Sequence, residues 1–117
     1  MTATVRVLNP DKGTVVAEQV ELATSFFTRL RGLLGRQGLN DGQGMLIRPT
    51  DSIHTFFMRF PIDVIFLDRS DRVLRLIPEM GPNRVSPLVR HGRTVIELPA
   101  GALARSRTQV GDQLTLG

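Results

Sequence analysis

Residues 54–68, HTFFMRFPIDVIFLD, are a strongly apolar run that holds His54, Arg59 and Asp63 and ends at Asp68. Pro61 has no backbone N–H to donate to a neighbouring strand, so the run divides there. The part that follows, IDVIFL, is apolar on both faces of an extended chain except at Asp63, which predicts a strand covered on both sides. Because buried ionisable groups need partners, His54, Arg59 and Asp63 either reach solvent at a bend or meet in a pocket.

The rest of the chain predicts a mainly β domain around this strand. Short apolar or alternating runs are expected to form further strands at residues 2–8, 14–20, 45–47, 72–77, 94–99 and 113–117. At residues 25–36 the apolar residues recur at the spacing of a helix. The prolines of residues 78–87 predict a long loop. We expect a single domain over residues 1–117, a two-sheet antiparallel sandwich or distorted barrel with one short helix near residues 25–36.

The composition excludes several classes of protein. The chain of 117 residues has no cysteine, which removes disulfides, thiolate catalysis and cysteine-ligated metals. It contains no apolar run near the roughly 20 residues that span a bilayer, and its N-terminus does not resemble a signal peptide. We therefore expect a cytoplasmic protein with no membrane partner.

The positive charge is carried almost wholly by arginine. The formal net charge is +4, and fourteen of the fifteen basic residues are arginines. Residues 84–107 hold five arginines against the single acid Glu97, so this window matches the net charge of the whole chain. Arginine recognises phosphates and carboxylates through its planar guanidinium. The window indicates either a solvated surface or a region that grips nucleic-acid phosphates without sequence specificity.

No catalytic or metal-binding motif is present. The sequence lacks HExxH, GxSxG, SxxK and phosphate-loop signatures, and its two histidines, His54 and His91, lie far apart. We therefore expect no metal and no cofactor. If Asp63 is buried, it needs either an arginine, Arg59 or Arg75, or several backbone N–H donors. Asp63 is then either a structural carboxylate or an orienting group or general base in a pocket.

Five sequence blocks occur in order along the chain. They are RLRGLLGR at residues 29–36, GMLI at 44–47, HTFFMRFPIDVIFLD at 54–68, VIELPAG at 95–101 and VGDQLTL at 110–116. Together they resemble the bacterial and archaeal domain-of-unknown-function family number 192, over nearly the whole chain. The resemblance implies a small mainly β domain with a short helix, and it implies no established activity. The chain departs from the family at Phe57-Met58-Arg59, where many relatives have Trp-Met-Lys.

These observations favour a binding or accessory module for an anionic small molecule or a peptide segment. The expected ligand-binding residues are His54, Phe57, Met58, Arg59, Asp63 and Glu97. The hypothesis requires the segment around Pro61 to fold inward, so that these groups share a pocket. One alternative is an acid/base or metal-assisted enzyme that uses His54 and Asp63. A second alternative is nonspecific nucleic-acid binding through residues 84–107.

Overall fold

The structure of the protein is a computed structural model that describes residues 3–23 and 38–117. The helix expected near residues 25–36 lies outside the described residues. The described part holds a helix, α2 (Ala102–Ser106), in the connection before the last strand. No helix in residues 3–23 and 38–117 is long and apolar enough to cross a membrane.

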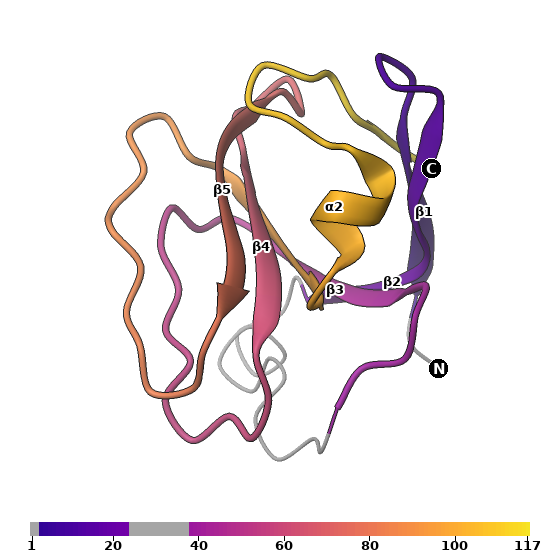
Figure 1. Cartoon of the computed structure of the whole chain (residues 1–117). Coiled ribbons are helices and arrows are strands. Elements are labelled where there is room, and N and C mark those ends of the chain that lie inside the picture. The colour runs from indigo at the N-terminus through magenta and orange to yellow at the C-terminus, as the bar shows by residue number, and fades with distance from the viewer. Residues whose placement is uncertain (1–2, 24–37) are drawn as a thin grey trace.

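In residues 3–23 and 38–117, seven strands form one curled sheet (Figure 1). Along the chain they are β1 (Thr4–Asn9), β2 (Thr14–Ala23), β3 (Gln43–Ile47), β4 (Ile62–Leu67), β5 (Val73–Met80), β6 (Thr94–Pro99) and β7 (Thr115–Leu116). Their order in the sheet is β5-β4-β6-β3-β2-β1-β7, so β5 and β7 form its edges. The predicted mainly β class is confirmed, and a single curled sheet corresponds to the distorted barrel rather than to two separate sheets.

One pair of strands departs from the antiparallel arrangement that the sequence predicts. β2 and β3 run parallel, whereas the other neighbours in the sheet are antiparallel. Parallel neighbours need a connection of about a dozen residues or more, and the chain between Ala23 and Gln43 supplies it. The packing around β3 is close: a Cβ at Gly44 would lie 2.9 Å from the Glu97 carbonyl oxygen and 2.9 Å from Leu98 Cδ2.

The two faces of the sheet bury different apolar cores. Along β4, Ile65 and Leu67 belong to the core on the face that α2 covers, while Val64 and Phe66 belong to the core on the opposite face. We call them the helix-side core and the loop-side core. In Figure 1, α2 lies within the curl of the sheet. Every residue of β4 and β6 is buried, which confirms the prediction of a strand covered on both sides.

β5 continues beyond its predicted end at Ile77. It includes Pro78 and ends at Met80, with a register shift in its pairing with β4. Proline is tolerated there because β5 is an edge strand. At the irregularity, Glu79 adopts a left-handed backbone conformation with φ 49°. The predicted loop therefore begins at Gly81 rather than at Pro78.

Two loops, residues 48–61 and 81–93, lie side by side, and we call them the paired loops. Thr55 N–H donates to Arg84 O at 2.8 Å, and Ser86 N–H donates to Ile53 O at 2.9 Å. An isolated antiparallel bridge joins His54 to the second loop. The stretch HTFFMRF therefore forms no regular strand, and the backbone of the second loop holds it in place.

Candidate functional site

Asp63 is buried and accepts hydrogen bonds from the backbone. Asp63 is 1% exposed, and its Oδ1 accepts a hydrogen bond from Glu79 N–H at 2.8 Å. Its Oδ2 accepts from Gly101 N–H at 3.0 Å and from Leu103 N–H at 2.9 Å. These bonds give an acceptor to an N–H group at the irregular end of β5 and to two N–H groups at the start of α2. The first N–H groups of a helix have no partner within the helix. Of the two kinds of partner that the sequence leaves open, backbone donors hold Asp63, so it joins β4, β5 and α2.

Glu97 is a second buried carboxyl, on β6. Glu97 is 3% exposed, and its cross-strand neighbours are Met45 and Val64. Burial in these apolar surroundings raises the pKa of Glu97 to about 7. A carboxyl with this pKa is present in both protonation states near neutral pH, so it is able to accept or donate a proton there.

The structure does not bring His54, Asp63 and Glu97 into one pocket, which corrects the shared-site hypothesis. Asp63 lies opposite Leu98 and faces the helix-side core, whereas Glu97 lies opposite Val64 and faces the loop-side core. Side chains alternate between the faces of a strand, and the register of β4 against β6 decides the side. His54 is exposed on the paired loops, so it is also separated from Asp63, its partner in the enzyme alternative.

The exposed aromatic residues of the first paired loop are held in a fixed arrangement. The rings of His54 and Phe56 stack with their centroids 5.1 Å apart, and Phe56 N–H donates to His54 Nδ1 at 3.3 Å. Phe57 is 82% exposed and has a left-handed backbone with φ 64°. Its N–H donates to Asn83 Oδ1 at 3.1 Å. Positive φ is uncommon for a bulky residue, and such strain persists where the surrounding structure fixes it, often at binding sites.

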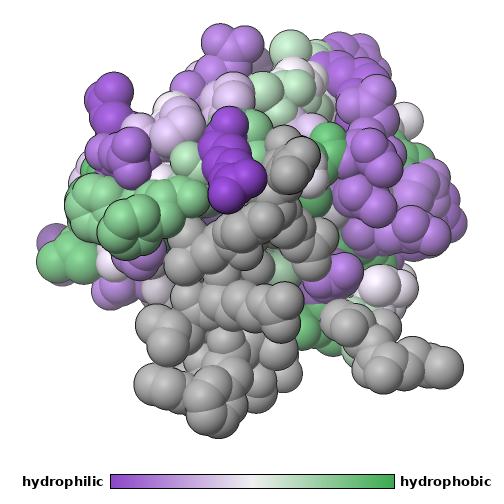
Figure 2. All heavy atoms as spheres, turned by 90° about the horizontal axis from the view of Figure 1, so that it is seen from below, coloured by the Kyte–Doolittle hydropathy of each residue, from purple (hydrophilic) through white to green (hydrophobic). Residues whose placement is uncertain are grey.

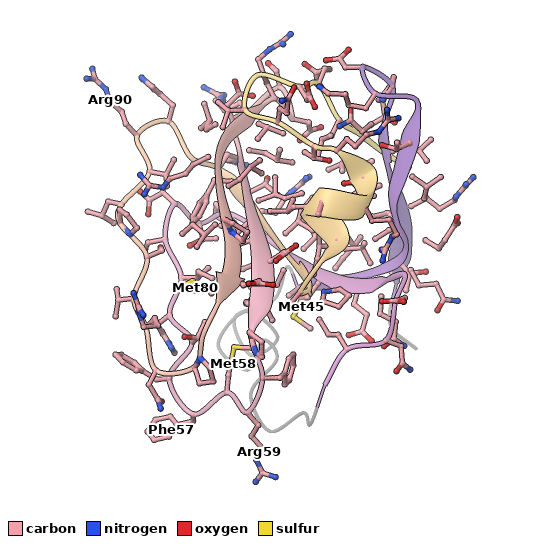
Figure 3. The ribbon with its side chains drawn as sticks, in the orientation of Figure 1. Met45, Phe57, Met58, Arg59, Met80 and Arg90 are labelled. Carbon is pink, nitrogen blue, oxygen red and sulfur yellow. The ribbon has the colours of Figure 1, made fainter. Side chains whose placement is uncertain are left out.

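The three consecutive residues Phe57, Met58 and Arg59 have different environments. Met58 is buried in the loop-side core, whereas Arg59 is exposed. Figure 3 shows the side chains of Phe57 and Arg59 projecting from the lower end of the molecule, with Met58 turned inward. Of the predicted ligand-binding residues, those exposed on the paired loops are His54, Phe57 and Arg59.

A cleft of about 340 Å³ lies beside the paired loops, lined by residues 75–81 and 84–87. We call it the arginine cleft. Its cations are Arg75 and Arg84, and its carboxylate is Glu79. The sequence indicates Arg75 only as a partner for Asp63. The alternation of apolar and charged residues along β5 could have indicated this site, because it predicts that Arg75 is exposed on its strand.

Large apolar side chains are exposed on the paired loops beside this cleft. Val85 is 64% exposed and Leu88 is 78% exposed. In the view from below, an apolar patch lies at the left of the molecule, next to hydrophilic side chains (Figure 2). The paired loops contain five arginines and one acidic residue, Asp51. The surface therefore combines exposed apolar groups with local positive charge.

The metal-assisted enzyme requires a cluster of metal-ligating side chains, and nucleic-acid binding requires the arginines of residues 84–107 to lie together. In the described part of the chain, no three side chains of the types that ligate metals gather into a group. The five arginines of residues 84–107 divide between two places. Arg84, Arg90 and Arg93 belong to the second paired loop, whereas Arg105 lies 3.7 Å from Asp41, and Arg107, at the end of α2, donates to the backbone of the β1–β2 turn.

Comparison with known proteins shows relatives over almost the entire length of the chain. The model of the DUF192 family, described as uncharacterized ACR, matches residues 7–116. A UPF0127 protein of Thermococcus sibiricus is 34% identical over 112 residues, which cover 92% of this chain and 72% of the relative. A UPF0127 protein of Pyrococcus furiosus is 32% identical over 111 residues, which cover 92% of this chain and 95% of the relative.

Two crystal structures have the same fold. A protein of unknown function from Novosphingobium aromaticivorans superposes with a TM-score of 0.82 at 25% identity, covering 97% of this chain and 84% of the other. A putative transcription regulator from Sinorhizobium meliloti superposes with a TM-score of 0.84 at 23% identity, covering 98% and 95%, and this likeness concerns the fold alone. The family match and the relatives together show that the chain belongs to the uncharacterised DUF192 family.

Proposed function

We propose that this protein is an accessory module that binds an acidic, partly apolar peptide segment of another protein. The observation that carries the proposal is the arginine cleft, where Arg75 and Arg84 lie beside exposed Val85. Guanidinium groups form paired, charge-assisted hydrogen bonds with carboxylates. Exposed apolar side chains next to such a cleft provide contact area for a partner.

A peptide fits this surface better than a compact small molecule does. Phe57 and Leu88 are exposed on the paired loops but lie outside the lining of the cleft. A ligand that reaches both the arginines and these apolar side chains has to be extended. The loop carrying Phe57 is already ordered by its bond to Asn83, which lowers the entropy cost of binding.

Fluorescence anisotropy with two labelled twelve-residue peptides tests the proposal. The first peptide alternates glutamates with leucines and serines, and the second replaces each glutamate by lysine. The acidic peptide is expected to bind at least tenfold more tightly than its lysine counterpart. The double variant Arg75→Ser/Arg84→Ser is expected to lose at least tenfold in affinity, because hydrogen bonds to charged groups contribute about 1.5–3 kcal/mol each.

The matched control is Arg105→Ser, which removes an exposed arginine that does not line the cleft and is expected to leave binding unchanged. Equal binding of the two peptides would contradict the proposal, as would an unchanged affinity of the double variant. If the protein bound anionic lipid vesicles more tightly than the acidic peptide, the partner would be a membrane surface and the peptide proposal would be wrong. Tighter binding to single-stranded DNA, steeply weakened by salt, would favour the nucleic-acid alternative instead.

A further inference from the structure

A depression of about 610 Å³, open to solvent, lies between β5 and α2. Its apolar wall is formed by Leu76 and Pro78 of β5 and by Leu103 and Ala104 of α2. We call it the β5–α2 cavity. Its volume falls within the range of roughly 300–1,000 Å³ that is typical of small-molecule sites. It is separate from the arginine cleft, although Leu76 and Pro78 of the strand between them line both.

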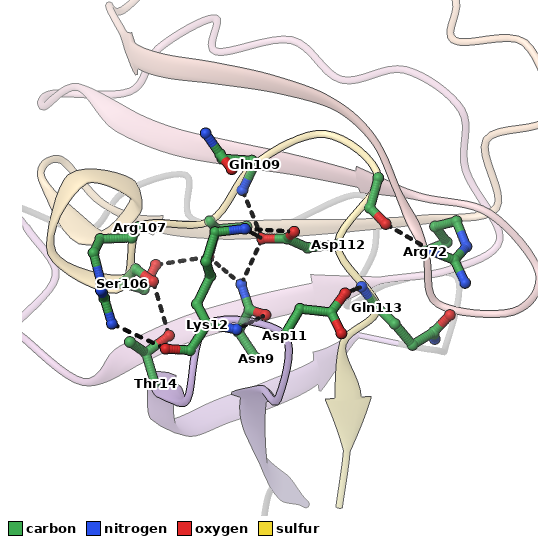
Figure 4. A network of polar contacts seen from close by, with 12 residues as sticks. Asn9, Asp11, Lys12, Thr14, Arg72, Ser106, Arg107, Gln109, Asp112 and Gln113 are labelled. Carbon is green, nitrogen blue, oxygen red and sulfur yellow. Dashed lines mark hydrogen bonds and ion pairs between the residues drawn. The ribbon is translucent and has the colours of Figure 1, made fainter.

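The remaining lining of the β5–α2 cavity is polar: Lys12, Arg107, Thr108 and Gln109. Lys12 Nζ lies 2.7 and 2.9 Å from the two carboxylate oxygens of Asp112, which compensates its charge. Arg107 Nη2 donates to Lys12 O at 2.9 Å (Figure 4). No acid among the described residues forms an ion pair with Arg107. Arg107 therefore brings an uncompensated charge and further N–H donors to the cavity.

The backbone at Arg107 is unusual for an arginine. It is the C-cap residue that follows α2, with φ 58° and ψ 28°, in the left-handed region. Glycine is the residue most favoured at such helix ends, because a side chain there is strained. The chain nevertheless carries at this position an arginine, whose side chain is the only one of the described lining residues to supply uncompensated charge to the cavity.

We propose that the β5–α2 cavity binds a small amphipathic carboxylate. The carboxylate pairs with the guanidinium of Arg107, and the aliphatic chain packs against Leu76, Pro78 and Leu103. Charge complementarity at Arg107 and the apolar wall select this class of ligand over neutral or cationic amphiphiles. The site does not depend on the proposed peptide-binding function, because Arg75 and Arg84 do not line it.

Titration of the full chain with octanoate, octan-1-ol and octylammonium, followed by calorimetry and by backbone amide NMR shifts, tests the proposal. Octanoate is expected to bind at least tenfold more tightly than octan-1-ol, and octylammonium more weakly than either. From hexanoate to octanoate, each added methylene is expected to increase the affinity about fourfold. The shifted amides are expected to cluster at residues 76–78 and 103–109.

Two variants separate the ligand contacts from effects on folding. Arg107→Gly is expected to reduce octanoate affinity to that of octan-1-ol, while the melting temperature stays unchanged or rises, because glycine removes the backbone strain. Ala104→Phe places a large side chain at an exposed position of the cavity wall and is expected to abolish binding of both ligands. Arg105→Ser, on the same helix but outside the cavity lining, is the matched control and should bind octanoate as wild type does.

Several results would overturn the proposal. They are the absence of octanoate binding at millimolar concentration, equal affinity for octanoate and octan-1-ol, an unchanged octanoate affinity of Arg107→Gly, and amide shifts confined to residues 81–93. The last result would assign the carboxylate to the arginine cleft rather than to the β5–α2 cavity.

Discussion

Glu97 keeps a carboxyl in an apolar core, where its charged form is costly. Burial raises its pKa from the ordinary 4.5 to about 7. Between these values the folded protein retains a proton that the unfolded chain has released, so the free energy of unfolding falls as pH rises through this window. The stabilisation present below pH 4.5 is fully lost above about pH 7, and the difference amounts to roughly 3 kcal/mol.

Glu97→Gln is expected to remove this pH dependence, because glutamine resembles the protonated carboxyl and does not titrate. At pH 8 the variant should exceed wild type by roughly 2–3 kcal/mol in unfolding free energy, and at pH 5 the two should be close. Chemical denaturation at both pH values measures the difference. The exposed Glu18→Gln serves as the control. If Glu97→Gln lost as much stability between pH 5 and 8 as wild type does, Glu97 would not be the source of the pH dependence.

Asp63 illustrates a buried carboxylate whose partners are all backbone groups. Asp63→Asn is expected to lower the unfolding free energy by about 2–4 kcal/mol, because an amide group has one acceptor oxygen and its NH₂ would face an N–H donor. Denaturant titration of this variant beside Asp51→Asn, an exposed aspartate, measures the loss. Equal stability of Asp63→Asn and wild type would show that the three N–H groups find other acceptors.

The sequence leaves the burial of Asp63 open and offers backbone N–H groups as one kind of partner, but it does not indicate which residues supply them. The donors Glu79, Gly101 and Leu103 lie 16, 38 and 40 residues away, and they converge only because β5 is irregular beside β4 and α2 follows β6. For Glu97 the limit is different. Its strand is buried on both faces, so the apolar pattern contains no alternation that would indicate which face the carboxyl occupies.

At the scale of elements, β3 is confined between β2 and β6. Gly44→Ala is expected to destabilise the protein by about 1–3 kcal/mol, because the added methyl group meets the backbone of β6 at 2.9 Å and cannot be relieved by a side-chain rotation. Gly38→Ala is the control, since a Cβ there has no atom within 4 Å. Thermal unfolding of the two variants measures the difference, and a neutral Gly44→Ala would mean that β3 and β6 separate at little cost.

Element boundaries could be predicted where the sequence gives sharp stops. β4 and β6 have the predicted bounds of residues 62–67 and 94–99, because continuous apolar runs end at turn residues or proline. The prediction failed at Pro78, since a proline in an edge strand does not interrupt pairing with the inner neighbour. The sequence also predicts that the segment around Pro61 folds inward, but there Phe56 and Phe57 are exposed and Met58 is buried.

At the scale of the whole molecule, strand order and loop pairing lie beyond sequence patterns. Nothing in the apolar pattern indicates that β2 and β3 run parallel, or that β3 lies next to β6. The arginine cleft and the β5–α2 cavity both depend on which segments flank β5. The sequence therefore predicts the residue types of a candidate site, whereas their convergence depends on topology.

Asp112 joins the end of β1 and the β1–β2 turn to the loop that precedes β7 (Figure 4). Its carboxylate accepts from Asn9 Nδ2 at 2.9 Å, from Lys12 Nζ at 2.7 and 2.9 Å, and from Gln109 N–H at 2.9 Å. Burial acts to raise the pKa of Asp112, but these hydrogen bonds and the Lys12 charge outweigh it and lower the pKa. The resulting stability is present above the ordinary value of 3.8 and is lost as pH falls through the lower folded pKa.

Asp112→Asn is therefore expected to reduce the unfolding free energy by about 2–3 kcal/mol at pH 7, because it removes the ion pair and leaves buried donors without an acceptor. The difference from wild type should shrink as pH falls below 3.8, because the unfolded wild-type chain then takes up a proton that the folded protein gains only at its lower pKa. Denaturation at pH 7, 5 and 3 measures it, with the exposed Asp41→Asn as control. A gap that stayed constant down to pH 3 would mean that Asp112 acts through its shape rather than its charge.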